Sequence, residues 1–442
     1  LPALALGLPL AAAIARFARS AALEVLYEDY IRTARAKGLT DHLVIWRHVF
    51  KNAMLPVVTT TGLALGGLLG GAVSVEKAFA VPGLGSLLVQ GLTERDWMMI
   101  QNLVLIYGLI YIFVNLIVDI SYAFLDPVPP AEGFGMNHSK ILPPDPKGLD
   151  VEIKSPSLVR RLFGSLARFV HSSPIGAVGL LFWVIMLCLA LFAPQISPFD
   201  PLEADYGAIR QAPSVHHLLG TDNLGRDVLS RVIFGFRITL IVSLISVFLG
   251  DMIGFVWGVA SGYLGGRFDL ISQRVVDVLM SFPALILALL LLVVSGAGLS
   301  TVIIAIAVTR IPSSTRIIRS VVLSVNQNAY IEAARCVGAS HARIMLRHIA
   351  PQVVAPILVV ATLNLGGAIF AESALSFLGL GIPPPAPSLG NMLGGVLAAA
   401  FKPPWWLVVY PGLAITFAIM AANLFGDALR DFLDPKLKKR ID

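Results

Sequence analysis

Charged side chains are scarce in this chain. Only 14% of its 442 residues are Asp, Glu, Lys or Arg, and 56% are hydrophobic, whereas a soluble domain carries about 25% charged residues. The shortage excludes a protein that exposes most of its surface to water. Apolar runs of about 20 residues are typical of transmembrane helices, and runs that are continuous rather than alternating exclude a transmembrane barrel. The composition therefore predicts an all-α, polytopic membrane protein.

The chain also lacks the patterns that carry catalysis or bind metals. Its two cysteines give no disulfide framework, and the sequence has no Gly-rich phosphate loop ending in Gly-Lys-Ser/Thr. No Ser/His/Asp or His/Cys group has catalytic or metal-ligand spacing. The nearest candidate, His216-His217, is a pair of adjacent side chains that point in different directions. We expect no catalytic residue, no metal and no cofactor here.

The net charge of +6 is concentrated in loops of one face, which makes nucleic acid an improbable partner. The loops at 262–283 and 316–350 together hold seven Lys and Arg, and the tail after residue 427 holds five. The three loops assigned to the opposite face hold only six between them. By the positive-inside rule, the basic loops and the C-terminus are predicted to be cytoplasmic.

Apolar runs predict about nine spans, three in a first half and six in a second. They lie at about 1–15, 53–73, 99–124, 174–193, 237–261, 284–297, 300–318, 352–373 and 405–427. The stretch 128–173, rich in Pro, Gly and Lys, is predicted to be a cytoplasmic linker between a domain at 1–127 and a domain at 174–442.

One segment occurs twice, and every landmark of it is displaced by 300 residues. Tyr30 to Gly38 matches Tyr330 to Gly338, and Arg-His and Pro follow at matching distances in both copies. Each copy predicts a short helix, a turn at the glycine and a second, amphipathic helix along the cytoplasmic face, which in the second copy runs from Ala342 to Ile349. Tyr330, Ala334 and Gly338 are spaced to share one helical face, and the glycine is predicted to take a positive φ. Two matched polar hairpins predict a docking site for a protein outside the membrane.

The two halves are unequal in length. The second half has 170 residues between position 160 and Tyr330, whereas the first has only 29 before Tyr30. We expect that an N-terminal truncation of the first half, rather than a nine-span design, explains this difference.

The second hairpin resembles a known motif. Glu332-Ala333-Ala334 with Gly338 is similar to the EAA motif of ATP-binding-cassette importer permeases, although Val354-Ala355-Pro356 stands where that motif ends in Leu-Pro. The second half also resembles the C-type permease of dipeptide and oligopeptide importers. The matching segments are Leu219-Gly-Thr-Asp-Asn-Leu-Gly-Arg-Asp227, Phe377-Leu-Gly-Leu-Gly381 and Pro387-Ser-Leu-Gly-Asn-Met392.

The first hairpin departs from the motif with Arg32-Thr33-Ala34, but it keeps Gly38 and ends in Leu55-Pro56. This form is similar to the B-type permease of the same importers, as is Val81-Pro-Gly-Leu-Gly85 after Glu76. The chain as a whole thus resembles a fusion of a truncated B-type and a complete C-type permease.

The resemblance implies a non-catalytic permease in a bacterial inner membrane. It implies that Tyr30, Arg32, Ala34 and Gly38, and likewise Tyr330, Glu332, Ala333, Ala334 and Gly338, dock on cytoplasmic ATP-binding subunits. It also implies an extracytoplasmic solute-binding protein as partner and di- or oligopeptides as substrate. Nickel or another small solute remains open with the same machinery.

A secondary transporter or channel without an ATPase is the alternative from another class. It predicts ionisable residues in matched spans of both halves, yet Asp251 has no visible counterpart in the first half. A membrane-bound enzyme is disfavoured because no catalytic cluster is visible.

Two further features are candidates for function. Asp251 lies in the middle of an apolar span, where ionisable groups are expected to be paired or functional, and Arg237 and Arg310 are its candidate partners. The acidic outer loop from Pro194 to Arg237 is a candidate contact for the solute-binding protein, with a local turn between Asp222 and Arg226 as the simpler interpretation.

Overall fold

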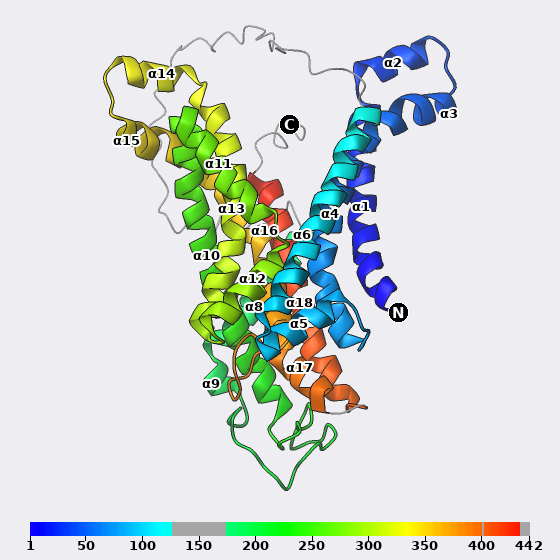
Figure 1. The fold of residues 1–442 in the computed structure, drawn as a ribbon, viewed down its shortest axis with the longest axis vertical. Helices are drawn as coiled ribbons and strands as arrows, with labels where there is room; N and C mark the ends of the chain where they lie inside the picture. The colour runs from blue at the N-terminus through cyan, green and yellow to red at the C-terminus, as the bar shows by residue number, and fades with distance from the viewer. Residues whose placement is uncertain (126–173, 400–401, 434–442) are drawn as a thin grey trace. The chain divides into compact units, whose positions relative to one another are not determined.

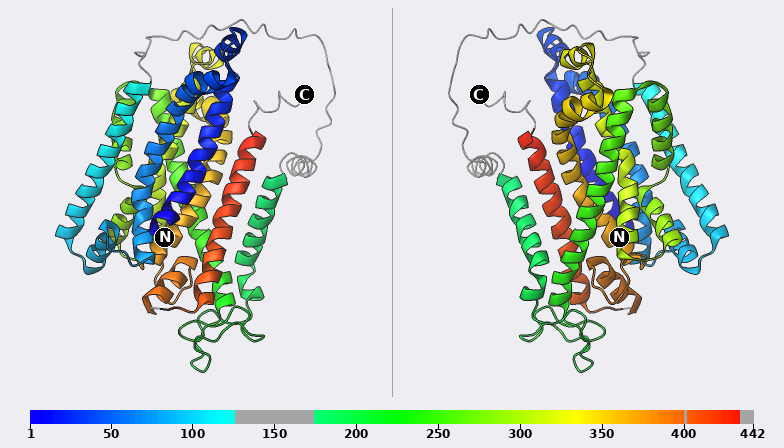
Figure 2. Two further views of the ribbon diagram at one scale, coloured as in Figure 1. Left: turned by 90° about the vertical axis from the view of Figure 1, so that its right-hand side faces the viewer. Right: turned by 90° about the vertical axis from the view of Figure 1, so that its left-hand side faces the viewer.

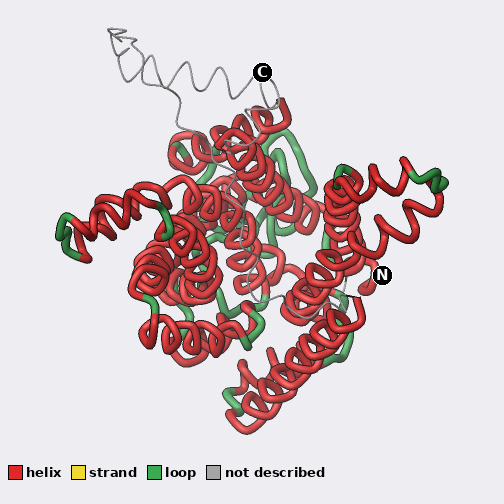
Figure 3. Tube along the Cα trace, turned by 90° about the horizontal axis from the view of Figure 1, so that it is seen from above, coloured by secondary structure: helices red, strands yellow, loops and turns green. Residues whose placement is uncertain are grey.

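The computed structural model describes residues 1–125, 174–399 and 402–433 (Figure 1). These residues form helices and loops, and their only bridge of strand type joins Thr221 to Asp227 (Figure 3). The prediction of an all-α chain is therefore confirmed. The predicted linker at 128–173 lies outside the described residues.

The described helices follow one another in an order that repeats after the linker. In the first half they are α1 (Pro2–Leu26), α2 (Asp29–Ala36), α3 (Asp41–Leu43), η1 (Val44–Val49), α4 (Phe50–Ala78), α5 (Leu84–Glu94) and α6 (Trp97–Leu125). In the second half they are α8 (Pro174–Leu191), α9 (Ala193–Ile196), α10 (Val228–Leu264), α11 (Gly266–Met280), α12 (Ala284–Ser295), α13 (Leu299–Asn326), α14 (Ala329–Cys336), α15 (His341–Arg343), η2 (Ile344–Ile349), α16 (Ala350–Phe377), α17 (Leu389–Ala399) and α18 (Trp405–Leu433).

Six of the described helices are long and apolar enough to cross a membrane, or up to eight spans if two bent pairs each count as one. The prediction of about nine spans exceeds this number. The difference lies in α8. Its apolar part, Gly176–Leu191, is shorter than the 18 residues required here of a helix that crosses a membrane. The predicted span at 284–297 is the second member of a bent pair, since α11 and α12 meet at 86°.

Helix α10 begins well before the predicted span at 237–261 and is 37 residues long. Asp227 explains its start, because the carboxylate Oδ2 accepts a hydrogen bond from the backbone N–H of Ser230 at 2.8 Å. A side-chain acceptor at this position satisfies an N–H that has no partner within the helix. A hydropathy window detects apolar length and overlooks such a cap.

A stripe of glycines lets α10 and α13 pack closely. Gly250, Gly254, Gly258 and Gly262 are spaced by four residues and therefore lie on one face of α10. A Cβ atom at Gly250 would lie 2.7 Å from the carbonyl oxygen of Ala307, and one at Gly262 would lie 2.9 Å from Val322 Cβ. Small residues at this spacing are typical of close helix pairs in membranes. The spacing is visible in the sequence, but the predicted spans rested on hydropathy and did not use it.

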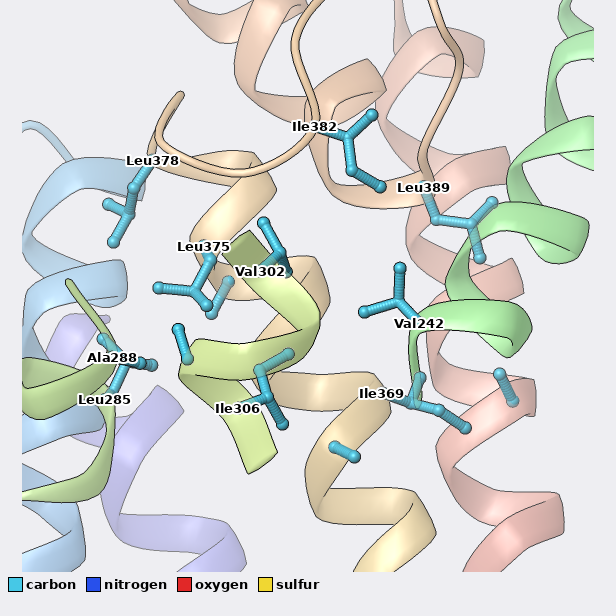
Figure 4. Close-up of a cluster of buried hydrophobic side chains, with 14 of the residues drawn as sticks. Val242, Leu285, Ala288, Val302, Ile306, Ile369, Leu375, Leu378, Ile382 and Leu389 are labelled. Atoms are coloured by element: carbon cyan, nitrogen blue, oxygen red, sulfur yellow. The ribbon is translucent and has the colours of Figure 1, made fainter. Parts of the chain in front are cut away.

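The chain divides into two compact units. Unit 1 comprises Leu1–Leu6, Gly66–Ile112 and Ser172–Asp442. It contains the main apolar core, to which both halves of the sequence contribute. Val73 and Leu88 come from the first half. Ile306, Ile369 and Leu375, which are labelled in Figure 4, come from the second. Within this unit α8 lies beside α18 (Figure 2). Unit 2 comprises Gly7–Leu65 and Phe113–His171.

Large apolar side chains also cover much of the outer surface of the long helices. Leu105 on α6 and Phe248 and Val256 on α10 are each more than 60% exposed. An apolar exterior of this kind is stable in lipid and would be an unusually large apolar patch in water. The helices therefore have the surface of a multi-pass membrane protein.

Candidate functional site: two matched hairpins

The second hairpin consists of α14, a tight turn, α15 and η2, and it joins the ends of two long helices, α13 and α16. Figure 1 shows α14 and α15 at the end of unit 1 opposite to α9 and α17. Its inner face rests on a small apolar cluster of its own, in which Ile331, Ile344 and Ile349 are almost completely buried. The first hairpin, formed by α2, α3 and η1, rests on an equivalent cluster in unit 2 that contains Ile31, Val44 and Val49.

Gly338 ends α14 in a left-handed turn, as predicted. Its φ is 79°, and Gly38 in the first copy has a φ of 81°. The N–H of Gly338 donates to the carbonyl of Arg335 at 2.9 Å, and the N–H of Ala339 donates to that of Ala334 at 3.0 Å. This pair of bonds is the Schellman arrangement, which satisfies the last carbonyls of a helix. An L-residue would be strained at this φ, which explains the glycine in both copies.

The second helix of each hairpin differs from the prediction. We expected an amphipathic α-helix from Ala342 to Ile349, but η2 is one π-helical turn, in which the N–H of Ala350 donates to the carbonyl of Met345, five residues back. The first copy repeats this geometry from Phe50 to Ile45. Residues five apart share a face of a π-helix, so Ile344 and Ile349 both reach the inner cluster. Such turns are rare and occur frequently at functional sites.

The predicted helical face also needs correction. We expected Tyr330, Ala334 and Gly338 to share one helical face, but Ala334 packs on the inner cluster beside Ile331 while Tyr330 is exposed. The reason is that Ile331, the branched aliphatic side chain of α14, sets the buried face, and Ala334 lies three residues further along the helix on that same face. Gly338 lies in the turn beyond the helix. Ala34 is likewise buried at 7% exposure in the first copy.

The outer face of the second hairpin carries the remaining predicted residues. Glu332 and Ala333 are exposed there, as is Arg32 in the first copy. Sequence reasoning missed a pair of large apolar side chains on the same face. Leu346 is 74% exposed, and Trp46, at the same position of the first copy, is 58% exposed. The sequence contained a signal for them, because Trp46 and Leu346 occupy the same position in the two copies, 300 residues apart.

The two copies hold their exposed polar groups differently. In the first, Arg35 Nε donates to Asp41 Oδ1 at 3.1 Å, which ties α2 to α3. In the second, Arg335 donates to Asn326 Oδ1 at 2.6 Å and lies over the ring of Tyr263, 5.3 Å from its centroid. The first copy also ties its predicted tyrosine, because Asn52 Nδ2 donates to the Tyr30 hydroxyl at 2.8 Å. The backbone path is therefore shared, while the side-chain contacts have diverged.

The family model for the inner membrane component of binding-protein-dependent transport systems matches residues 1–128 and 252–439. The chain belongs to this family. A model for the N-terminal transmembrane domain of oligopeptide transport permease C matches residues 166–213. The two matches confirm the resemblance to an importer permease of the oligopeptide type.

Curated relatives agree with the family. The glutathione transport system permease protein GsiD of Escherichia coli O1:K1 is 40% identical over 284 residues, which are 64% of this chain and 93% of that protein. Its counterpart in Pectobacterium atrosepticum is 40% identical over 272 residues, which are 61% of this chain and 90% of that protein. The chain therefore contains nearly the full length of these permeases.

Asp251, the predicted intramembrane candidate, lies in a polar cluster inside the permease. Its Oδ1 accepts hydrogen bonds from the hydroxyl of Ser314 and from Asn364 Nδ2, the latter at 3.2 Å. Arg310 Nη1 donates to Asn364 Oδ1 at 3.4 Å, so that Asn364 bridges the acid and the base. Of the two candidate partners, Arg310 is therefore in the cluster, while Arg237 is exposed. The cluster connects α10, α13 and α16, and the second hairpin joins α13 to α16.

The outer loop before α10 is held by its own acidic residues. Asp222 accepts hydrogen bonds from the N–H groups of Leu224 and Arg226 and forms an ion pair with the Arg226 guanidinium at 2.7 Å. The Nδ1 atom of His217 lies 3.0 Å from Asp227 Oδ1. The described part of the chain contains no group of three or more His, Cys, Asp or Glu side chains that could hold a metal ion.

Proposed function

We propose that this permease carries peptides across the membrane and that both hairpins dock on ATP-binding subunits. Membership of the family of binding-protein-dependent transport components supports the proposed transport across the membrane. The curated relatives named for glutathione transport support a small peptide as the substrate.

The observation that carries the docking proposal is the matched geometry of the hairpins. Each copy places an exposed large apolar side chain, Trp46 or Leu346, at the same position of a π-helical turn that is anchored by buried residues. Trp is one of the residue types enriched among the few residues that dominate an interface, and Leu346 offers an apolar surface at the same position. A loop that only connected two spans would not need this surface in both copies.

The hairpins are also placed to transmit motion. Helices α13 and α16 leave the two ends of the second hairpin, and α4 leaves the first. We infer that a closing pair of ATPase subunits displaces the hairpins and that the long helices transmit the displacement to the outer side. The hairpins and the C-terminus are then cytoplasmic, in agreement with the basic loops. The outer loop before α10 faces the solute-binding protein.

Replacement of the exposed apolar residue tests the docking proposal. Leu346→Asp should lower the affinity for the ATP-binding subunit by about thirtyfold or more, because interface residues of this kind contribute about 2 kcal/mol or more. Co-purification from membranes measures the loss. Val294→Ser is the control, because Val294 is also 74% exposed but lies at the end of α12 rather than on a hairpin. Unchanged recovery of the ATPase with Leu346→Asp would refute the docking role.

A further inference from the structure

A second repeated motif lies at the far end of the helices that follow the hairpins. Glu76-Lys-Ala-Phe-Ala-Val-Pro-Gly-Leu-Gly85 matches Glu372-Ser-Ala-Leu-Ser-Phe-Leu-Gly-Leu-Gly381 with a displacement of 296 residues. Each copy begins in the last turns of a long helix, α4 or α16, and leads toward a shorter one, α5 or α17. Both copies belong to unit 1. The permease thus has two copies of this motif, each at the end of the long helix that follows a hairpin.

In the second copy the glutamate is fully engaged within the protein. Glu372 has no exposed surface. Its Oε2 accepts a hydrogen bond from the hydroxyl of Thr239 and its Oε1 accepts one from that of Ser376, both at 2.8 Å. The N–H of Ile382 donates in turn to the Ser376 hydroxyl at 3.4 Å. Glu372 therefore holds the loop through Ser376 and offers no oxygen to a ligand.

In the first copy one oxygen of the glutamate accepts no hydrogen bond from a described residue. Ala80 stands where the second copy has Ser376, so the hydroxyl donor is missing. The N–H of Ser86 donates directly to Glu76 Oε2 at 2.8 Å. Among the described residues, no hydrogen bond to Glu76 Oε1 and no ion pair of the neighbouring Lys77 occurs. Lys77 is exposed, and Glu76 is half-buried.

Both of these charged side chains line a pocket of about 420 Å³. Val81 and Phe377 line it together, and they occupy the same position of the two motif copies. The pocket therefore lies where the two motif copies meet. Gly394 of α17 completes the wall beside Phe377. The size is within the range of small-molecule sites, and the lining combines a carboxylate, an ammonium group and apolar surface.

We propose that this pocket binds a short zwitterionic peptide on its way through the permease. The Glu76 carboxylate receives the peptide's α-ammonium group, Lys77 receives its terminal carboxylate, and Val81 and Phe377 contact its side chains. Charge-assisted hydrogen bonds of this kind are about twice as strong as neutral ones. This inference depends on the proposed peptide substrate and adds the residues that recognise it.

Uptake by the complete transporter in proteoliposomes tests the recognition. Dialanine and glutathione are the probes, and N-acetyl-dialanine and dialanine amide are the analogues that lack one terminal charge. Glu76→Gln and Lys77→Gln should each lower dialanine uptake about tenfold or more. Glu76→Gln should also reduce the preference for dialanine over its N-acetyl analogue. Glu94→Gln and Lys402→Gln, which change exposed groups outside the pocket, should leave uptake unchanged.

Protection from labelling tests the location without relying on the rate of transport. Cys188 and Cys336 are replaced by Ser, and Ala80→Cys places one thiol in the pocket. Dialanine should slow its reaction with a membrane-impermeant maleimide several-fold and leave Lys402→Cys unprotected.

The outcomes separate this inference from the proposed function. Suppose that the wild type takes up dialanine or glutathione, that Glu76→Gln and Lys77→Gln take it up equally well, and that position 80 is not protected. This result would refute peptide binding in the pocket and would leave the proposed peptide transport intact. Glu76 would then only hold its loop through Ser86. Failure of the wild type to take up either probe would overturn the peptide substrate and the pocket together.

Discussion

The anchor of the second hairpin can be tested by one substitution, Ile331→Ala. Helix α14 has eight residues, and Ile331 is its fully buried side chain. Isolated helices shorter than about 12 residues are marginal in water, so the helix depends on this contact. Removal of a buried Ile side chain to Ala costs about 2–5 kcal/mol. The cost falls on a short element whose other contacts include Ala334 on the same cluster and Arg335 with Asn326 and Tyr263.

This magnitude sets the expected result in hydrogen exchange. If α14 opens as a local unit, a loss of about 2–5 kcal/mol raises the exchange rate of its amides by about thirtyfold to a few thousandfold, up to the limit of an unfolded segment. The exchange of α10 and α13 should change little, because their contact lies mainly along the glycine stripe. Recovery of the ATP-binding subunit should fall in parallel, since docking would first have to order the frayed helix.

A matched substitution on the exposed face completes this test. Cys336→Ala alters an exposed residue of the same helix and should leave amide protection intact, because Ala has a higher helix propensity than Cys. Ile31→Ala should repeat the effect in the first hairpin, where Ile31 is also fully buried. Unchanged protection of α14 in Ile331→Ala would refute the reasoning, and so would an equal loss of protection in Cys336→Ala.

Two further predictions concern the turn and the intramembrane cluster. Gly338→Ala should destabilise the hairpin by about 1–2 kcal/mol, because the positive φ is unfavourable for an L-residue. The added Cβ atom would meet no other atom within 4 Å, so no steric clash adds to this cost. A much larger loss of stability measured by hydrogen exchange would indicate a clash and contradict this account. Asp251→Asn should destabilise the permease by about 1–3 kcal/mol, because it removes the charged acceptor of Ser314 and Asn364 and the negative charge in the cluster that holds the half-buried Arg310. Adding Arg310→Gln should recover part of that loss in a thermal-unfolding assay, and additive losses would show that the two residues are not coupled.

The features predicted correctly were those that depend on local backbone chemistry. A glycine at the end of a short polar helix predicted the positive φ of Gly38 and Gly338, because few other residues adopt it. Apolar runs located the long helices, because lipid requires continuous apolar surface. The ends of the helices were placed less well, since the start of α10 depends on the side-chain cap of Asp227 rather than on hydropathy.

The features that were missed depend on the match between distant elements. The buried pair Ile344 and Ile349 is spaced by five residues, which fits neither face of an α-helix, and only a π-helical turn brings both onto the cluster. The partner of Asp251 could not be chosen from sequence, because Asn364 lies 113 residues away along the chain and bridges to Arg310. Such contacts follow from helix packing and have no local pattern.

The two hairpins agree in shape and differ in charge, and this difference constrains their partners. Arg32 in the first copy stands where the second has Glu332, and Lys37 stands where the second has Val337. A groove with charges complementary to Glu332 would repel Arg32, and like charges brought together at an interface cost several kcal/mol. One kind of groove can therefore fit both hairpins only through what they share, which is the glycine turn, the π-helical turn and the apolar side chain of Trp46 or Leu346. Distinct grooves for the two hairpins would require two different ATP-binding subunits. The subunit composition of the transporter therefore depends on whether the shared features or the differing charges of the hairpins supply most of the binding energy.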